Sequence, residues 1–206
     1  MSSPAHAGAR PPLAIRAAPA GATYEAPRAR APIGLFDSGL GGLTVVRALE
    51  QRLPHESFWF VADQQHVPYG GRPLSQISDL AAALGHTLRH SGCKLIIPAC
   101  NVSCATALEE GRLPAETVGV IRPAVQAALQ QSPGALGVVA TEATVASGCY
   151  TRVTGQLDET REIVSVAAPA FVPLVESGDL SSDTARREAQ AVMQQFPEHI
   201  RTVILG

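Results

Sequence analysis

"IGLFDSGLGGLTVVRALEQRLP", residues 33–54, contains a strand, a loop and a helix in direct succession. The apolar run at 33–36 predicts a short strand that a parallel sheet buries on both faces. From 43 to 53, apolar residues recur at helical spacing, which predicts a helix that packs on that sheet. Short apolar segments alternate with amphipathic ones along the rest of the chain. This alternation predicts an α/β fold with mostly parallel sheets.

The other elements follow from the same patterns. Strands are expected at 33–36, 58–62, 94–98, 117–120, 136–140, 163–166 and 202–205. Helices are expected at 43–53, 74–90, 103–110, 123–131, 144–156, 172–177 and 182–195. Near Pro123 the succession of strand and helix begins again. The chain is therefore expected to form two α/β lobes, over residues 33–124 and over residues 125–206.

Composition narrows the class of protein. The 206 residues are 46% hydrophobic and 17% charged, with a net charge of −2. This balance allows a substantial core and offers no basic surface for nucleic acid. No apolar run approaches the roughly 20 residues that span a membrane, so a soluble protein is expected. Cysteines without paired spacing, in a chain with no secretory signal, predict the cytoplasm. Residues 1–32, rich in Ala, Pro and Arg, are expected to be a disordered extension.

Four cysteines are present, and their spacing favours neither disulfides nor a metal site. No chain segment matches a dinucleotide-binding or Walker motif, so no cofactor is expected. Cys93 and Cys104 are interpreted as small buried apolar residues. Cys100 differs, because it follows an apolar strand and begins a helix, where amides and the helix dipole favour the thiolate. Asn101 beside it can donate a hydrogen bond to a carboxylate.

Other candidate residues also follow strands, at the sheet edge where α/β proteins bind ligands. Asp37 and Ser38 precede a glycine-rich turn, which is equally compatible with helix capping and with anion binding. Tyr69 and Gly70 lie in a loop predicted by Pro68 and two glycines, where a surface role for Tyr69 is the simpler alternative.

Two further positions complete the set of candidates. Thr141, with Thr144, lies between a strand and a helix, where hydroxyls either cap the helix or bind an anion. Glu176 lies beside an apolar run that could perturb its carboxyl group, and an ordinary solvated glutamate is the alternative. A thiol, carboxylates, hydroxyls and amides at strand ends suit proton transfer on a small anionic molecule.

Six segments in this order closely resemble the glutamate racemases, within the cofactor-independent aspartate/glutamate racemase superfamily. They are "IGLFDSGLGGLTVVRALEQRLP", "FVADQQHVPYGGRP", "IIPACN", "GVIRPA", "ATEATVASGCY" and "AFVPLVESG". The resemblance covers residues 33–206. It implies two α/β lobes with the active site in the cleft between them, a glutamate substrate, no cofactor, and a product, D-glutamate, used for peptidoglycan.

The resemblance also implies a mechanism, in which two thiols on opposite faces of the glutamate Cα remove and deliver a proton. Cys100 matches the first thiol, which acts on D-glutamate. Asp37 would assist it, and Glu176 matches a carboxylate on the side of the second thiol. The residues that would hold the substrate are Ser38, Tyr69, Gly70, Asn101 and Thr141.

Several positions depart from the pattern of the family. Val102 replaces the threonine of its Cys-Asn-Thr motif, and Arg122 and Ala168 replace a glutamate and a cysteine. The second catalytic cysteine would follow Gly206, so both lobes are expected to be incomplete. Two alternatives therefore stand beside a glutamate racemase: an inactive glutamate-binding protein, and a racemase for aspartate or another amino acid. The oligomeric state is left open, with a homodimer as one alternative.

Overall fold

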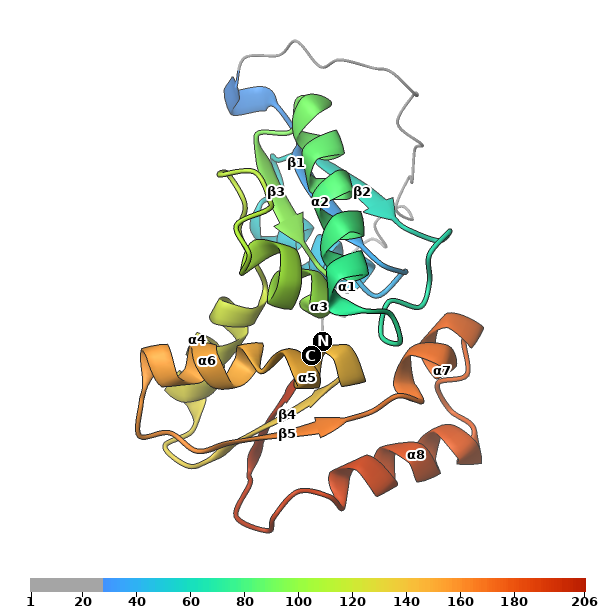
Figure 1. Cartoon of the computed structure of the whole chain (residues 1–206), viewed down its shortest axis with the longest axis vertical. Coiled ribbons are helices and arrows are strands. Elements are labelled where there is room, and N and C mark those ends of the chain that lie inside the picture. Colours follow the sequence, from blue (N-terminus) through green and yellow to red (C-terminus); the bar gives the residue numbers. More distant parts are fainter. Residues whose placement is uncertain (1–27) are drawn as a thin grey trace, which may run out of the picture.

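Residues 28–206, the part of the chain that the computed structural model describes, form two parallel sheets with helices packed around them (Figure 1). This arrangement confirms the predicted α/β class with two lobes. Residues 1–27 of the expected extension lie outside the described residues. At its end, η1 (Arg28–Arg30) is a short 3-10 helix, and Ala31 is buried.

The first lobe is a sheet with the strand order β2-β1-β3. β1 lies at its centre and is buried along its whole length, with Leu35 paired to Phe60 on one side and to Ile97 on the other. The elements of this lobe are β1 (Ile33–Asp37), α1 (Leu43–Arg52), β2 (Phe58–Ala62), α2 (Leu74–His90), β3 (Leu95–Pro98), α3 (Asn101–Ser103) and the π-helical segment η2 (Cys104–Leu108).

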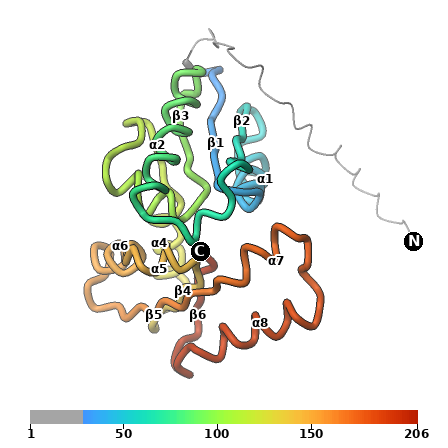
Figure 2. The backbone as a smooth tube through the Cα atoms, turned by 45° about the vertical axis from the view of Figure 1, so that its right-hand side comes forward, coloured from blue at the N-terminus to red at the C-terminus, as the bar shows by residue number. Residues whose placement is uncertain are grey.

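The second lobe repeats this plan with the strand order β5-β4-β6, and β4 is the buried central strand. Its elements are α4 (Ile121–Gln131), β4 (Leu136–Ala140), α5 (Glu142–Ser147), α6 (Cys149–Leu157), β5 (Ile163–Ala167), α7 (Phe171–Ser177), α8 (Asp183–Met193) and β6 (Thr202–Leu205). Figure 2 shows the first lobe above the second, with the C-terminal end of the chain between them. None of the helices of residues 28–206 has the length and hydrophobicity needed to cross a membrane.

One predicted strand is wrong. The segment 117–120 forms a single bridge, between Ile96 and Thr117, rather than a strand. Val118 is about half exposed, and the chain enters α4 at Ile121, so the segment has no room to extend the sheet. It instead connects the two lobes.

Two predicted helices are also different from expectation. The helix expected at 144–156 is two helices, because Gly148 adopts a left-handed φ of 66° that ends α5 and begins α6. The helix expected at 103–110 begins as α3 and widens into η2, where the Glu109 amide donates to the Cys104 carbonyl. A π-helical turn of this kind often marks a functional site.

Close packing at Gly137 makes the core of the second lobe sensitive to one methyl group. A Cβ at this position in β4 would lie 2.8 Å from the Phe196 ring and 3.0 Å from Ile200. We expect Gly137→Ala to lower the free energy of unfolding by about 1–3 kcal/mol, because the neighbours must move. Gly155→Ala is the matched control, since its helical position has no neighbour within 4 Å. Urea titration should show the control unchanged or slightly stabilised.

Candidate active site

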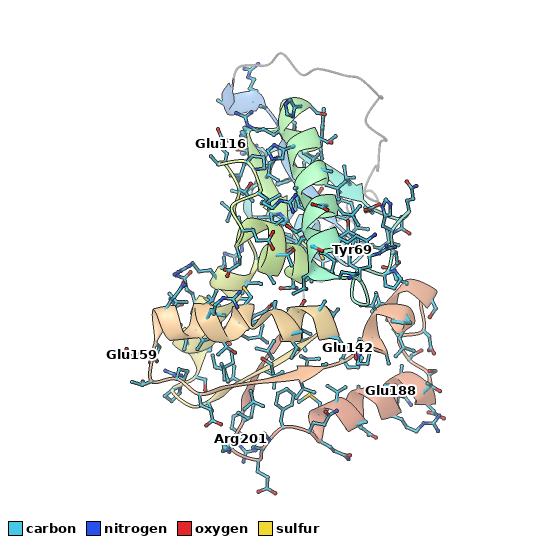
Figure 3. All side chains as sticks on the ribbon, viewed as in Figure 1. Tyr69, Glu116, Glu142, Glu159, Glu188 and Arg201 are labelled. Atoms are coloured by element: carbon cyan, nitrogen blue, oxygen red, sulfur yellow. The ribbon has the colours of Figure 1, made fainter. Side chains whose placement is uncertain are left out.

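A cavity of about 440 Å³ lies where the two lobes meet. Strand ends and loops of the first lobe line it together with α5, α6, α7 and the end of β6 of the second. All the residues that the sequence proposed for the site line this one cavity: Asp37, Ser38, Tyr69, Gly70, Cys100, Asn101, Thr141 and Glu176. Tyr69, labelled in Figure 3, marks the edge of the first lobe that faces the second.

The Asp37 carboxylate organises the glycine-rich loop after β1. It is 7% exposed, and its Oδ1 accepts the Ser38 amide N–H at 2.7 Å. Its Oδ2 accepts the amide N–H of Gly42, the residue that precedes α1. A Cβ at Gly42 would lie 2.9 Å from the Cβ atoms of Ala99 and Asp37, so only glycine brings the loop this close. The carboxylate is thus fixed beside the cavity by backbone donors.

Cys100 lies between β3 and α3, where it occupies the N-cap position of α3. It is 8% exposed, and its thiol donates a hydrogen bond to Ser38 Oγ at 3.6 Å. The Ser38 hydroxyl in turn lies 3.4 Å from Asp37 Oδ1. A chain of polar atoms therefore leads from the sulfur to the carboxylate.

The ionisation of Cys100 differs from expectation. Burial raises the pKa of its thiol and the negative charge of Asp37 raises it further, while the nearby polar groups of Ser103 and Ser38 lower it. Position at a helix start was expected to favour the thiolate, but the sulfur is buried and lies near the negative charge of Asp37. A raised pKa favours the thiol form of Cys100 over the thiolate.

The Tyr69 hydroxyl is already hydrogen-bonded within the first lobe, although the residue lines the cavity. The hydroxyl donates to Asp63 Oδ2 at 2.7 Å, and His66 Nδ1 contacts the same carboxylate at 2.8 Å. Burial and this bond both raise the pKa of Tyr69. Its ring packs beside Cys100 in one apolar cluster. Sequence reasoning did not foresee that Asp63 fixes Tyr69.

Asn101 and Gly70 of the first lobe each contact the second lobe at the cavity. The Tyr150 hydroxyl, from α6, donates to Asn101 Oδ1 at 2.9 Å. Gly70 lies against Thr141, where an added Cβ would be 3.4 Å from the Thr141 Cβ. Sequence reasoning gave Tyr150 no role, although it ends the segment ATEATVASGCY, because only the docking of the lobes brings it to Asn101.

Thr141 and Glu176 come from the second lobe. The Thr141 hydroxyl caps α5 by accepting the Thr144 amide N–H at 3.3 Å, and it also lines the cavity. Capping and ligand contact are thus compatible at this position. Glu176 Oε1 accepts the Leu40 amide N–H at 3.2 Å, and its carboxylate lies against Gly39. The glycine-rich loop of the first lobe is therefore tied to α7.

The three departures from the family pattern have different settings. Val102 is 3% exposed and packs in the apolar cluster that includes Cys100, so its side chain lines the cavity without a hydroxyl. Ala168 is buried in a cluster of the second lobe. Arg122 lies outside the cavity described above and donates to Gln156 Oε1 at 2.7 Å.

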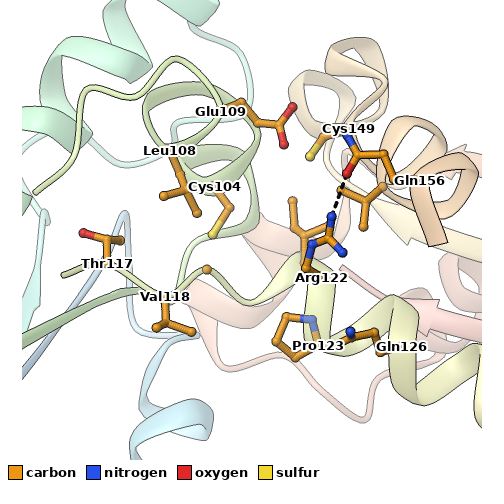
Figure 4. Close-up of a pocket in the computed structure, with 13 residues that line it drawn as sticks. Cys104, Leu108, Glu109, Thr117, Val118, Arg122, Pro123, Gln126, Cys149 and Gln156 are labelled. Atoms are coloured by element: carbon orange, nitrogen blue, oxygen red, sulfur yellow. Dashed lines mark hydrogen bonds between the residues drawn. The ribbon is translucent and has the colours of Figure 1, made fainter. Parts of the chain in front are cut away.

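Arg122 lines a second cavity, of about 380 Å³, beside the segment that connects the lobes (Figure 4). Cys104 and Cys149 also line it, and burial raises the pKa of each thiol to about 12. Neither of these cysteines lines the cavity that holds Cys100. Among the described residues, no group of three or more His, Cys, Asp or Glu side chains could hold a metal ion.

Comparisons with known proteins point to one family, although no family model matches the chain. The chain is 38% identical over 178 residues to the glutamate racemase of Limosilactobacillus reuteri, covering 85% of this chain and 67% of that relative. It is 39% identical over 178 residues to the glutamate racemase of Streptococcus pneumoniae, with the same shares covered.

Solved structures point to the same family. A glutamate racemase from Bacillus anthracis superposes with a TM-score of 0.80 at 30% identity, covering 85% of this chain and 67% of that one. The glutamate racemase of Francisella tularensis in complex with D-glutamate gives 0.79 at 32% identity, covering 85% and 68%. At this identity and coverage, the chain belongs to the glutamate racemase family of isomerases.

Proposed function

We propose that Cys100 transfers the Cα proton of glutamate in the interconversion of the L and D enantiomers. The observation that carries this proposal is the position of the Cys100 thiol, which opens on the cavity between the lobes and is joined to Asp37 through Ser38. Proton transfer needs an acid or base within reach of the substrate and a route for the proton. The thiol and the carboxylate supply both.

The proposed proton transfers form a relay. Asp37 accepts the thiol proton through the Ser38 hydroxyl as substrate binds, and the thiolate then takes the proton from the Cα of D-glutamate. Inversion requires a second acid on the opposite face of the Cα, and in the family resemblance this thiol follows the glycine equivalent to Gly206. Leu205 and Gly206 line the same cavity as Cys100, which supports a site of this design.

Polar groups on both lobes are suited to hold the two carboxylates and the amine of glutamate. Ser38 and Asn101 come from the first lobe, and Thr141 from the second. Gly70 has no side chain, so its backbone can approach the substrate closely. Glu176 lies on the α7 side of the cavity, where the second thiol is expected. That the Francisella tularensis relative was crystallised with D-glutamate supports glutamate as the substrate here.

Calorimetric titration with the enantiomers of glutamate and aspartate tests the substrate. We expect glutamate to bind at least tenfold more tightly than aspartate, because a site that fits the longer side chain loses one methylene contact and one carboxylate position with the shorter. Tighter binding of aspartate would favour the aspartate racemase alternative, in which Val102 belongs to a different carboxylate pocket. Binding of neither amino acid would contradict the proposal.

The contact between Tyr150 and Asn101 yields a second prediction. Tyr150→Phe keeps the buried ring and removes the hydroxyl that donates to Asn101 Oδ1. We expect the Kd for D-glutamate to rise about three- to tenfold, because the Asn101 amide is no longer held in one orientation. Calorimetry measures the change, and an unaltered Kd would show that Tyr150 does not position Asn101.

The wider role follows from the product. We propose that the D-glutamate supplies peptidoglycan synthesis, and thereby cell-wall biogenesis and cell shape, in the cytoplasm. We also propose two structural units close to the 33–124 and 125–206 expected from the sequence, with the boundary moved to Ile121 so that α4 stays whole in the second unit. A homodimer is the assembly to test by light scattering.

A further inference from the structure

We propose that Ser103 is a positioning residue, whose hydroxyl stabilises the thiolate of Cys100. This inference rests on the proposed role of Cys100 as a base. Nothing in the family resemblance assigns a role to this serine, which follows Val102 at the end of α3.

The first observation is an unused hydrogen-bond donor. Ser103 is fully buried, and its Oγ has no hydrogen-bond partner within the described residues. The buried hydroxyl of Thr106 in η2 is satisfied, since it donates to the Val102 carbonyl at 2.8 Å, whereas those of Thr117 and Thr154 also lack a partner. A buried hydroxyl without a partner is costly and rare in native proteins, so its retention calls for a reason.

The second observation is the position of Ser103 relative to the sulfur. Cys100 is the N-cap residue of α3, and Ser103 is the third residue of that helix. At this spacing the N-cap side chain normally accepts a hydrogen bond from the backbone of the third residue. Here the Cys100 side chain forms no cap hydrogen bond, and its sulfur belongs to the same helical turn as the Ser103 amide and hydroxyl. Both of these Ser103 groups lower the pKa of Cys100.

The thiol and the thiolate differ in what they can accept. A thiol sulfur is a weak acceptor, whereas a thiolate carries a full negative charge and accepts hydrogen bonds strongly. The Ser103 hydroxyl therefore lacks a partner in the resting state and gains one when Cys100 ionises. A bond made only in the reactive form favours that form selectively.

Other groups facing the sulfur have the opposite effect or act from a different side. The Asp37 charge raises the pKa of Cys100, and Ser38 already accepts the thiol hydrogen bond at 3.6 Å. Tyr69 and Cys104 also sense the charge of Cys100, and ionisation of either would oppose the thiolate. Val102 adjoins Ser103 but is apolar. Within the turn 101–103, Ser103 carries the hydroxyl that can reach the sulfur.

The test is the pH dependence of Cys100 alkylation by iodoacetamide, followed on the Cys100 peptide by mass spectrometry in the full chain. Ser103→Ala should shift the profile to higher pH and slow alkylation about tenfold at pH values below the thiol pKa. The thermal midpoint should stay the same or rise, because an unpartnered buried hydroxyl is removed. Ser103→Thr, which keeps a hydroxyl, should restore the profile toward the original.

Thr106→Val is the matched control, because it removes a buried hydroxyl from the adjoining η2 segment that is bonded to a carbonyl and not to the sulfur. Its alkylation profile should match that of the unaltered chain. The inference is overturned if Ser103→Ala leaves the profile unchanged, or if Thr106→Val shifts it equally. Failure of the proposed function is separate, since it would appear as Cα exchange that persists in Cys100→Ser.

Discussion

Replacing Cys100 with serine should reduce the exchange of the Cα proton of D-glutamate for solvent deuterium by about a thousandfold or more. A serine hydroxyl does not ionise near neutral pH, so the site loses the group that removes the proton, and positioned acid–base groups contribute about 10²–10⁴-fold to rate. The measurement is the loss of the Cα signal in D2O by NMR. Binding of D-glutamate should persist, because the thiol makes one long hydrogen bond, to Ser38.

Cys104→Ser provides the matched control for this substitution. Its sulfur donates to the Pro98 carbonyl at 3.2 Å and lines the second cavity, so a serine there keeps a donor and leaves the Cys100 site intact. Exchange should remain near that of the unaltered chain. Equal loss of exchange in both variants, or retained exchange in Cys100→Ser, would refute the role of Cys100.

Asp37→Asn should have two effects of opposite sign. The Asp37 carboxylate raises the pKa of Cys100, so removing its charge should lower that pKa and speed alkylation of Cys100 at neutral pH. Exchange of the D-glutamate Cα proton should nevertheless slow by about a hundredfold or more, because no carboxylate remains to accept the thiol proton. Parallel alkylation and NMR measurements on one sample resolve the two effects.

The stability of Asp37→Asn must be measured with these rates. The carboxylate accepts the amide N–H groups of Ser38 and Gly42, and an asparagine can accept only on its oxygen. One amide is then unpaired, and we expect the free energy of unfolding to fall by about 1–3 kcal/mol. If alkylation and exchange both quicken in a folded sample, Asp37 is not the proton acceptor.

Much of the fold could be predicted from periodicity alone. The bounds of β2, α2, β4 and β6 agree with the predicted segments, because each is a short apolar run or an amphipathic stretch between turn residues. The segment 117–120 was apolar enough to predict a strand, but it connects the lobes and pairs at one residue. The break at Gly148 depends on a left-handed φ that a helical pattern does not reveal.

In the candidate site too, local sequence predicts some features and packing determines the others. Most of its residues could be proposed because they follow a strand, and strand ends of parallel sheets meet at one edge. Glu176, in α7, was proposed from the apolar run beside it. Local sequence did not predict the burial that raises the pKa of Cys100, because burial depends on how the second lobe covers the first. Nor could local sequence predict that Tyr150 contacts Asn101 or that the Ser103 hydroxyl lacks a partner, since both depend on side chains brought together by packing.

The most direct test of Cys100 as the proton-transferring group is NMR of D-glutamate and L-glutamate with this chain in D2O. Titration calorimetry and a cooperative thermal transition would first establish that the sample is folded and binds glutamate. We predict that D-glutamate loses its Cα proton signal, and that Cys100→Ser retains it. A folded sample that binds D-glutamate and leaves the Cα signal intact would contradict the assignment of Cys100.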